Sequence, residues 1–541
     1  MPDRVYMTQP DGNGGVVEYT WAQVADEARR GAAYLKSLNL PPLSNIGLLG
    51  KNSAHWVMAD LAIWMAGHVT VPLYPTLNAE TASYILEHSE ARLLVLGKLD
   101  GKTDSWNEMR HGIPADMPMV GLPMSPVLAI PQWQQLVRDF APLPDAPRAV
   151  SELATIVYTS GTTGKPKGVM HSFASLAAPC RVSAEFWKTT AEDRMLSYLP
   201  LSHIAERAAV EVPSLVFGFR VYFADRLETF QQDLKRARPT LFFSVPRLWT
   251  KFYLAINEKL PPKKQKLIFA LPIISGIVKK KILTELGLDQ TRVALTGAAP
   301  LPASIIAWYR NLGLELLEVF GMTENCATSH FCRPGQVRPG YVGQPAPGVE
   351  CRIGDGGEVL IKSPGQMMGY YKMPEKTAEE TTPDGYFRTG DCGEIDEQGR
   401  LRVTGRVKEL FKTSKGKYVA PSPIESRLGS HPKVEVVCVT GPSEPQPFAL
   451  LMLSLDAHAE LADGRLSRDT LQQEFEALLA EVNGVIEDHE RLDYLVVVRD
   501  QWTIESGFLT PTMKLKRNVI EQRYLPQAER WRALKQKVVW E

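Results

Sequence analysis

Stretches of strand character and stretches of helix character alternate through the first half of this 541-residue chain. Residues 20–38 carry apolar side chains at helical spacing, and short apolar runs such as 46–49 and 69–73 have the length of buried strands. Strands and helices that take turns predict a parallel sheet covered by helices on its faces. The further predicted elements are helices at 53–66, 79–88, 172–187, 204–217 and 228–236, and strands at 92–96, 194–199, 220–223, 240–245 and 292–296.

The pattern changes twice in the second half of the chain. Residues 341–403 consist of short strand-like runs separated by Gly, Pro and Asp turns, and from residue 408 helix and strand signals mix again. A chain of this length is too long for one core. We therefore predict an α/β fold: a large N-terminal domain of helix-covered parallel sheets (1–407) that includes a β-rich subdomain, followed by a small α+β C-terminal domain (408–541).

The amino-acid composition argues against several kinds of partner and site. Sixty-one basic and sixty-one acidic residues cancel, which argues against a general nucleic-acid binder. Six cysteines at irregular spacing favour reduced thiols over a disulfide framework or a zinc site. The first residues lack the apolar core of a secretory signal, so the sequence predicts a cytoplasmic protein.

Two uncharged stretches have some membrane character. Residues 117–137 contain four prolines, which would break a spanning helix, so we predict an irregular connection there. Residues 267–278 are too short to span, but lysines flank them on both sides. Two interpretations stay open: a buried helix with solvated lysines at its ends, or peripheral contact of 263–281 with the inner face of an anionic membrane.

A polar, glycine-rich stretch follows the predicted strand at 153–157. It reads Tyr-Thr-Ser-Gly-Thr-Thr-Gly-Lys-Pro-Lys-Gly over residues 158–168, and we expect a helix to begin near His171. Glycines let backbone N–H groups approach phosphate oxygens, hydroxyls donate hydrogen bonds, and lysines supply positive charge. A Walker-type loop is excluded, because that motif needs four residues between its first glycine and its Gly-Lys. The candidate polyphosphate ligands are Thr159, Ser160, Gly161, Thr162, Thr163, Gly164, Lys165 and Lys167.

Five further stretches combine reactive side chains with strand ends or turns. They are Leu-Pro-Leu-Ser-His-Ile-Ala-Glu-Arg (199–207), Leu-Thr-Gly-Ala-Ala-Pro (295–300), Phe-Gly-Met-Thr-Glu (320–324), Phe-Arg-Thr-Gly-Asp (387–391) and Thr-Gly-Arg-Val-Lys-Glu (404–409). A basic stretch, Pro-Thr-Met-Lys-Leu-Lys-Arg, lies at 511–517. Each alone is compatible with an ordinary turn or solvated patch, and Glu206 could simply pair with Arg207.

The glycine-rich stretch followed by these six motifs, in this order, resembles the acyl-adenylate-forming (AMP-binding) superfamily, and the versions at 199–207 and 513–517 are similar to those of long-chain fatty acyl-CoA synthetases. The resemblance implies that Lys514 stabilises the adenylation transition state, with Lys516 as a minor rival, and that Lys408 is a hinge. Residues 412–420 would line a pantetheine tunnel after the C-terminal domain moves. The remaining implied contacts are His203 with the acid, Gly297, Ala298, Ala299 and Phe320 with adenine, Thr323 with phosphate, Glu324 with Mg²⁺, and Asp391 and Arg406 with the ribose.

The implied reaction joins a fatty acid to coenzyme A at the expense of ATP, with Mg²⁺, through an acyl-AMP intermediate. A carboxylate needs this activation because its own leaving group is too basic. Loading of a carrier protein, and CoA ligation of medium-chain or aromatic acids, stay open as alternatives, as do monomer and homodimer. The stretch 249–292 is shorter than in many long-chain members, which leaves the acyl length open.

Overall fold

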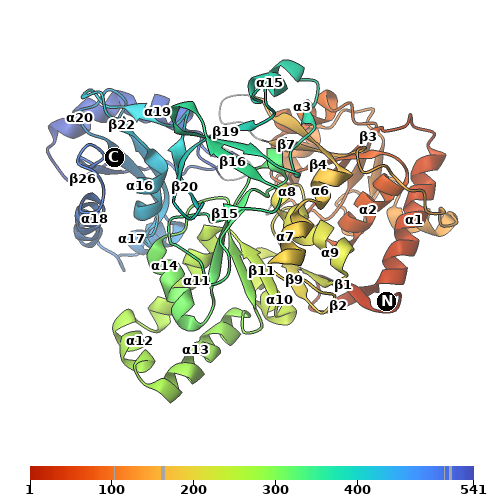
Figure 1. Ribbon diagram of the computed structural model, residues 1–541, viewed down its shortest axis with the longest axis horizontal. Helices are drawn as coiled ribbons and strands as arrows, with labels where there is room; N and C mark the ends of the chain where they lie inside the picture. Colours follow the sequence, from red (N-terminus) through yellow and green to blue (C-terminus); the bar gives the residue numbers. More distant parts are fainter. Residues whose placement is uncertain (103, 160–164, 505, 511–513) are drawn as a thin grey trace.

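The computed structural model describes residues 1–102, 104–159, 165–504, 506–510 and 514–541. A seven-stranded sheet forms the core of the N-terminal part (Figure 1). Its central strands are parallel and buried, while β8 and β18 add an antiparallel edge. In spatial order the strands are β18 (Gly369–Tyr370), β8 (Lys167–Ser172), β7 (Leu153–Thr159), β4 (Val69–Leu73), β3 (Asn45–Leu49), β5 (Leu93–Leu96) and β6 (Met119–Gly121).

Helices cover this sheet as the alternating pattern predicts. The Thr20 side chain accepts from the backbone of Gln23 and the Gln23 side chain accepts in return, which fixes the start of α1 (Trp21–Ser37). This helix packs on α2 (Ala54–Met65). The other helices of this part are α3 (Ala79–His88), α4 (Trp106–Met109), α5 (Trp133–Asp139), α6 (Phe173–Ala177), α7 (Pro179–Glu185), α8 (Ile204–Glu206) and α9 (Val212–Phe217). The predicted fold class is confirmed, with an antiparallel edge that the sequence pattern did not indicate.

The large domain contains two further sheets before its β-rich region. One has the order β2 (Val16–Thr20), β1 (Val5–Pro10), β10 (Arg220–Phe223), β9 (Arg194–Ser197). The other has the order β11 (Leu241–Ser244), β12 (Val293–Thr296), β13 (Leu316–Phe320), β14 (His330–Phe331), β15 (Gln344–Pro345). Helices α10 (Phe230–Ala237), α11 (Pro246–Lys259), α12 (Pro262–Phe269), α13 (Pro272–Leu286) and α14 (Ala303–Leu312) belong to this region.

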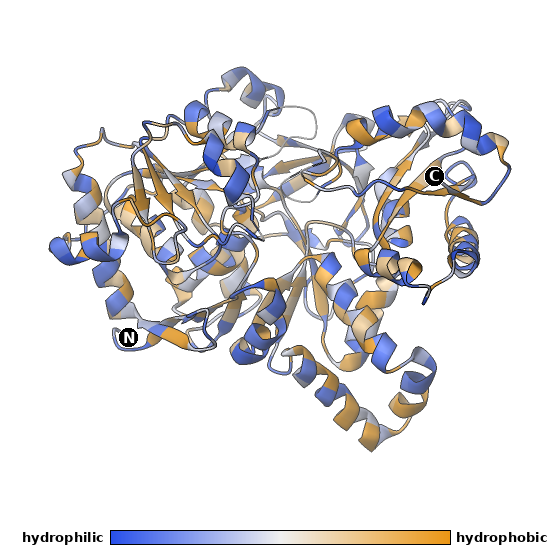
Figure 2. Cartoon of the chain, turned by 180° about the vertical axis from the view of Figure 1, so that it is seen from behind, coloured by the Kyte–Doolittle hydropathy of each residue, from blue (hydrophilic) through white to orange (hydrophobic). Residues whose placement is uncertain are grey.

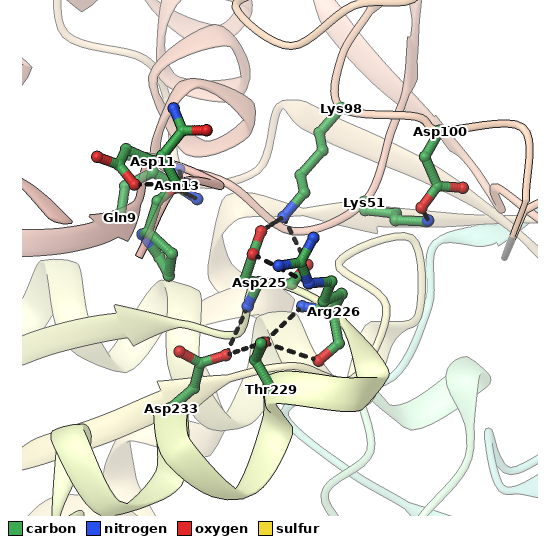
Figure 3. A network of polar contacts seen from close by, with 12 residues as sticks. Gln9, Asp11, Asn13, Lys51, Lys98, Asp100, Asp225, Arg226, Thr229 and Asp233 are labelled. Atoms are coloured by element: carbon green, nitrogen blue, oxygen red, sulfur yellow. Dashed lines mark hydrogen bonds and ion pairs between the residues drawn. The ribbon is translucent and has the colours of Figure 1, made fainter. Parts of the chain in front are cut away.

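A polar network ties the first sheet to the second (Figure 3). Lys98, just after β5, donates to the Asp225 carboxylate at 2.9 Å, just after β10. The Asp225 backbone N–H in turn donates to Asp233 on α10, which also accepts from Thr229. The carboxyl ends of strands from separate sheets are therefore held side by side.

The structure corrects two predictions near the glycine-rich stretch. That stretch leads from a strand into a second strand, β8, which pairs antiparallel with β7, and not directly into a helix near His171. The helix predicted over 172–187 is two short helices. Ser172 caps the first by accepting from the Ser175 N–H, and Pro179, which has no N–H to donate, begins the second.

The β-rich region forms an antiparallel sheet of β16 (Glu350–Ile353), β17 (Glu358–Lys362), β19 (Phe387–Ile395) and β20 (Leu401–Arg406), and α15 (Pro374–Glu379) lies beside β18. From Phe411 the chain builds separate sheets and its own core, drawn in blue in Figure 1. Its strands are β21 (Phe411–Lys412), β22 (Tyr418–Val419), β23 (Val434–Thr440), β24 (Phe448–Leu453), β25 (Leu495–Val497) and β26 (Val538–Trp540); its helices are α16 (Pro421–Leu428), α17 (Leu455–Ala462), α18 (Arg468–Asn483), α19 (Arg517–Tyr524) and α20 (Ala528–Ala533).

Both stretches with membrane character differ from the simplest expectation. The connection at 117–137 contains β6 and the start of α5. The stretch 267–278 is not a buried helix: it joins α12 to α13, and Ile273 in it is 82% exposed. Across the described ranges, no helix combines the length and the apolar character needed to cross a bilayer.

Candidate active site

A cavity of about 1860 Å³ lies where the large domain, the β-rich sheet and the C-terminal part meet. The predicted site residues that line it are Thr159, Lys165, Lys167, His203, Ala298, Ala299, Phe320, Thr323, Glu324, Asp391, Arg406, Lys408 and Lys514. The predicted phosphate ligands Ser160, Gly161, Thr162, Thr163 and Gly164 lie outside the described residues. Motifs that are far apart in the sequence thus share one space.

Gly297 has a packing role instead. A Cβ atom added there would lie 2.7 Å from Cγ2 of Val319 and 2.9 Å from its carbonyl oxygen, so no larger residue fits between β12 and β13. The next residue, Ala298, has a left-handed backbone, with φ of 69°. Gly297 lets the strand end sharply, and the two alanines after it border the cavity.

The phosphate side of the cavity carries a hydrogen-bonded series of three side chains. Nζ of Lys167 donates to the Tyr370 hydroxyl oxygen at 3.1 Å, and that hydroxyl donates to Oε1 of Glu324 at 2.8 Å. The Lys167 ammonium also lies 4.2 Å from the centre of the Tyr370 ring. Burial lowers the pKa of Lys167, and the nearby Glu324 carboxylate opposes this shift. The series fixes a positive and a negative group at the end of the β7–β8 hairpin.

A buried histidine holds the neighbouring loop. Nε2 of His171 donates to the carbonyl oxygen of Thr323 at 2.7 Å, and its Nδ1 lies 3.0 Å from the Ser175 hydroxyl. Burial lowers the pKa of His171 to about 4, so the ring is neutral and the proton on Nε2 is committed to this bond. Thr323 and Glu324 are therefore positioned by β8.

An ion pair also borders the cavity. Asp391 on β19 accepts from Nε of Arg406 on β20 at 3.0 Å, and Asp391 is buried while Arg406 is half exposed. Gly390 lies within β19 directly before Asp391 and has a φ of 67°, a conformation that favours glycine. Burial raises the pKa of Asp391 to about 6, against the opposing effects of Arg406 and Lys514.

Lys514 comes from the C-terminal part and borders the same cavity. Its backbone N–H and carbonyl oxygen both bond to Thr510, which fixes its place. The pKa of Lys514 is lowered, mainly by burial and to a smaller extent by the charge of Arg406. The carboxylates of Asp391 and Glu324 oppose this shift. Arg517 also borders the cavity but donates to Glu425 at 2.6 Å, and Lys516 is not among the described residues that border the cavity. Geometry thus favours Lys514 over its rival.

His203 borders the cavity at the start of α8 and has an assignable tautomer. Its Nδ1 accepts from the Ala205 N–H at 3.1 Å, so in the neutral ring the proton is on Nε2. Burial, and then Lys514, lowers the pKa of His203 to about 4. A neutral N–H donor next to a lysine suits the binding of a carboxylate.

The ion pair between Glu206 and Arg207 that the sequence suggested is not formed. Arg207 is fully buried and pairs with Asp60 and with Glu211, the latter at 2.7 Å. Glu206 accepts from the Tyr198 N–H at 3.0 Å, and burial raises its pKa to about 8. Adjacent helical residues point in different directions, so sequence neighbours were poor candidates for a pair.

Among the described residues, Glu324 could hold a nucleotide-bound magnesium ion. The described residues contain no group of three or more His, Cys, Asp or Glu side chains able to hold a metal. Glu324 offers one carboxylate oxygen, Oε2, in addition to the oxygen that accepts from Tyr370. Mg²⁺ commonly takes one carboxylate and completes its shell with phosphate oxygens and water, so Glu324 is sufficient for a nucleotide-bound ion.

Sequence reasoning missed Tyr370 and His171. Tyr370 reaches the site because β18 pairs with β8, a pairing between residues about 200 positions apart that no local pattern shows. His171 lies three residues after the end of the glycine-rich stretch, and the prediction of a helix there hid its strand position.

Comparisons with known proteins identify the family of this chain. The model of the "AMP-binding enzyme" family matches residues 1–371, and that of the "AMP-binding enzyme C-terminal domain" matches 409–531. The chain is 28% identical to the long-chain-fatty-acid–CoA ligase FadD15 of Mycobacterium bovis, covering 96% of this chain and 92% of that protein. It is 30% identical to the peroxisomal long chain acyl-CoA synthetase 6 of Arabidopsis thaliana, covering 93% and 80%.

Solved structures share the fold. An anthranilate CoA ligase, AuaEII, in complex with anthranoyl-AMP aligns with a TM-score of 0.79 at 22% identity over 98% of this chain and 95% of that one. The O-succinylbenzoate coenzyme A synthetase of Bacillus subtilis with AMP aligns with a TM-score of 0.72 at 22% identity, covering 96% and 95%. The resemblance inferred from the six motifs is confirmed, and this chain belongs to the AMP-binding enzyme family.

Proposed function

We propose that this chain is an AMP-forming fatty acid:CoA ligase that activates a long-chain fatty acid as acyl-AMP and transfers the acyl group to coenzyme A. The observation that carries the proposal is the meeting of Lys514, Glu324 and the Asp391–Arg406 pair around one cavity. Cationic and anionic groups there come from three regions that are far apart in the sequence. A purely structural role would not require them to converge on open space.

In the first step a carboxylate oxygen of the acid bonds to the α-phosphorus of ATP, and the bond from that phosphorus to the bridging oxygen of pyrophosphate breaks. Negative charge accumulates on the α-phosphate and the acyl carboxylate. The Lys514 ammonium borders the cavity, within electrostatic influence of Asp391 and Glu324, and stabilises that charge. A bound Mg²⁺ supplies charge neutralisation of the phosphates.

Three contacts position the substrates for this step. The ionised Asp391 accepts hydrogen bonds from both ribose hydroxyls, with Arg406 holding the carboxylate in place. Lys167 and the Thr323 hydroxyl contact phosphate oxygens. The Nε2–H of His203 donates to the acid carboxylate, and because that ring is neutral it orients the acid without neutralising the nucleophile.

The second step needs a different position of the C-terminal part. Lys514 borders the cavity, whereas none of residues 412–420, all of which the structure describes, does so. We propose that this arrangement performs adenylation, and that rotation about Lys408 then withdraws Lys514 and brings 412–420 to the site. The CoA thiol bonds to the acyl carbon, AMP leaves, and the thiol proton passes to solvent.

The long-chain substrate is supported by the relatives above, two of which are named for long-chain acids. The test is an assay of AMP and pyrophosphate formation across acids of increasing length, with and without coenzyme A. We expect AMP, acyl-CoA and the highest kcat/KM with long-chain acids. Formation of ADP, or no nucleotide cleavage with any acid, would overturn the proposal, and turnover only with an acyl carrier protein would overturn its second half.

A further inference from the structure

A helical hairpin projects from the large domain at the end of α11. Helices α12 and α13 form the lowest part of the molecule in Figure 1 and extend away from the sheets. The hairpin is fixed at its base: Trp308 donates to Gln265 at 2.8 Å, and Gln265 donates to Asn257 on α11 at 2.6 Å. Ile282 and Leu286 are buried, so one face of α13 packs inward. The opposite face of α13 therefore points away from the body of the protein.

That outward face is apolar. Ile273 and Ile277 are one turn apart on α13 and are 82% and 65% exposed, and Leu267 on α12 is 71% exposed. Leu271 and Ile274 at the tip are each about half exposed. Figure 2 shows these helices with orange segments on the part farthest from the body. Single exposed apolar residues are common, but a cluster on a projecting element marks an interaction surface.

Positive charge surrounds the apolar cluster. Residues 259–284 contain seven lysines and no aspartate or glutamate. Lys263, Lys264, Lys266, Lys280 and Lys281 are exposed. Lys279 points inward, donating to Asn311 at 2.9 Å. Two acidic residues flank this range: Glu258 borders the active-site cavity, and Glu285 is engaged by Lys235 at 2.7 Å.

We propose that the outer face of the α12–α13 hairpin docks this protein on the surface of an anionic lipid bilayer. Leu267, Ile273 and Ile277 enter the boundary of the acyl region, and the lysines contact headgroup phosphates. Charge argues against a second copy of the chain as the occupant, because two hairpins face to face would bring together two sets of lysines without acidic partners. The hairpin is too short to span, so the contact is peripheral.

The hairpin is continuous with the wall of the active-site cavity. Leu254, Ala255, Asn257 and Glu258 on α11 border that cavity, and Asn257 is the residue that Gln265 of α12 holds. Docking would place this end of the cavity next to the bilayer. Resting on the proposed function, the inference assigns a source to the substrate: a fatty acid dissolved in the membrane, not in water.

Vesicle co-sedimentation of the full chain, without ATP or acid, tests the docking independently of catalysis. We expect binding to phosphatidylcholine vesicles that contain phosphatidylglycerol, weakened by salt, and little binding to phosphatidylcholine alone. The double variant Ile273→Ser/Ile277→Ser should bind about 10-fold more weakly or worse. Lys263→Glu/Lys280→Glu should lower binding to the anionic vesicles only.

Matched controls change exposed residues elsewhere. Leu227→Ser replaces another side chain that is 77% exposed, and Arg530→Glu/Lys535→Glu reverses two exposed charges of the C-terminal part. Both should bind as the parent does. Failure of the parent to sediment with anionic vesicles, equal loss in the controls, or a lipid-free dimer that Ile273→Ser/Ile277→Ser dissociates would overturn the proposal. AMP formation in detergent would still report on the proposed function.

Discussion

The hydroxyl of Tyr370 donates a 2.8 Å hydrogen bond to Oε1 of Glu324. The same hydroxyl oxygen accepts a hydrogen bond from Lys167. Tyr370 therefore links Lys167, the proposed phosphate ligand, to Glu324, the proposed magnesium ligand. A tyrosine can do both because its oxygen donates once and accepts as well. Burial, followed by Glu324, raises the Tyr370 pKa, so the proton stays on the hydroxyl.

Replacement of this tyrosine should weaken the metal-dependent step. Tyr370→Phe keeps the ring under Lys167 but removes the hydrogen bond that orients Glu324. Loss of such an outer partner typically costs 10-fold to 100-fold, so we expect about a 10-fold lower kcat/KM for ATP and a higher Mg²⁺ requirement. Magnesium titrations of pyrophosphate release measure this. Tyr371→Phe is the matched control, and an unchanged Mg²⁺ profile in Tyr370→Phe would contradict the role.

Removal of the cavity lysine should stop adenylation and spare the thioester step. Lys514→Ala should lower acyl-AMP formation by about 100-fold to 1000-fold, the usual effect of deleting a group that stabilises transition-state charge. Formation of acyl-CoA from supplied acyl-AMP should stay near the parent rate. Lys516→Ala should leave both half-reactions intact. If Lys516→Ala loses adenylation and Lys514→Ala retains it, the assignment is reversed.

The ribose contact should be sensitive to pH. Burial raises the pKa of Asp391 to about 6, and only the ionised carboxylate can accept from both ribose hydroxyls. As pH falls below about 6, kcat/KM for ATP should therefore fall by about 10-fold per unit. Measurements of kcat/KM for ATP between pH 5 and pH 8, in buffers of equal ionic strength, test this prediction. A flat profile in the parent would contradict it.

The same carboxylate should destabilise the fold when ionised. Its pKa is raised above the ordinary 3.8, so the folded state holds the proton more tightly, and stability falls as pH rises from about 4 to about 6. Asp391→Asn removes this cost and should raise the free energy of unfolding by up to about 3 kcal/mol at pH 7 while weakening ATP binding. Denaturant unfolding at pH 4 and pH 7 checks the sign: the gain should vanish at pH 4.

Local patterns predicted much of this architecture, and the failures have physical causes. The α3 helix and the buried strands β3, β4 and β5 lie where apolar spacing indicated. Strand β8 was missed because its short run after the loop has few residues to distinguish a strand from a helix. For residues 267–278 a buried helix was one of two interpretations, and it was wrong. An apolar run alone does not show whether its side chains pack inside the protein or face outward.

Pairings distant in sequence could not be predicted at all. The Tyr370–Glu324 bond depends on a two-stranded edge contact, and the true partners of Arg207 lie on α2 and on the following turn of its own helix. The chemistry of the six motifs indicated that they converge, but not the hydrogen bonds that support them. Those supports come from packing between elements, which has no local signature.

The position of the C-terminal part should depend on a contact across the two domains. Arg247 on α11 pairs with Glu435 on β23. Because Arg247 is exposed, the pair contributes at most about 1 kcal/mol, or about fivefold in an equilibrium between domain positions. Arg247→Glu places like charges together and should lower the adenylation rate by up to about fivefold without lowering thioester formation. The double variant Arg247→Glu/Glu435→Arg should restore adenylation.

Arg352→Glu, which breaks the exposed pair with Asp384 inside the large domain, is the control. Equal loss of both half-reactions in Arg247→Glu would show that the contact supports the fold and does not select the adenylating position.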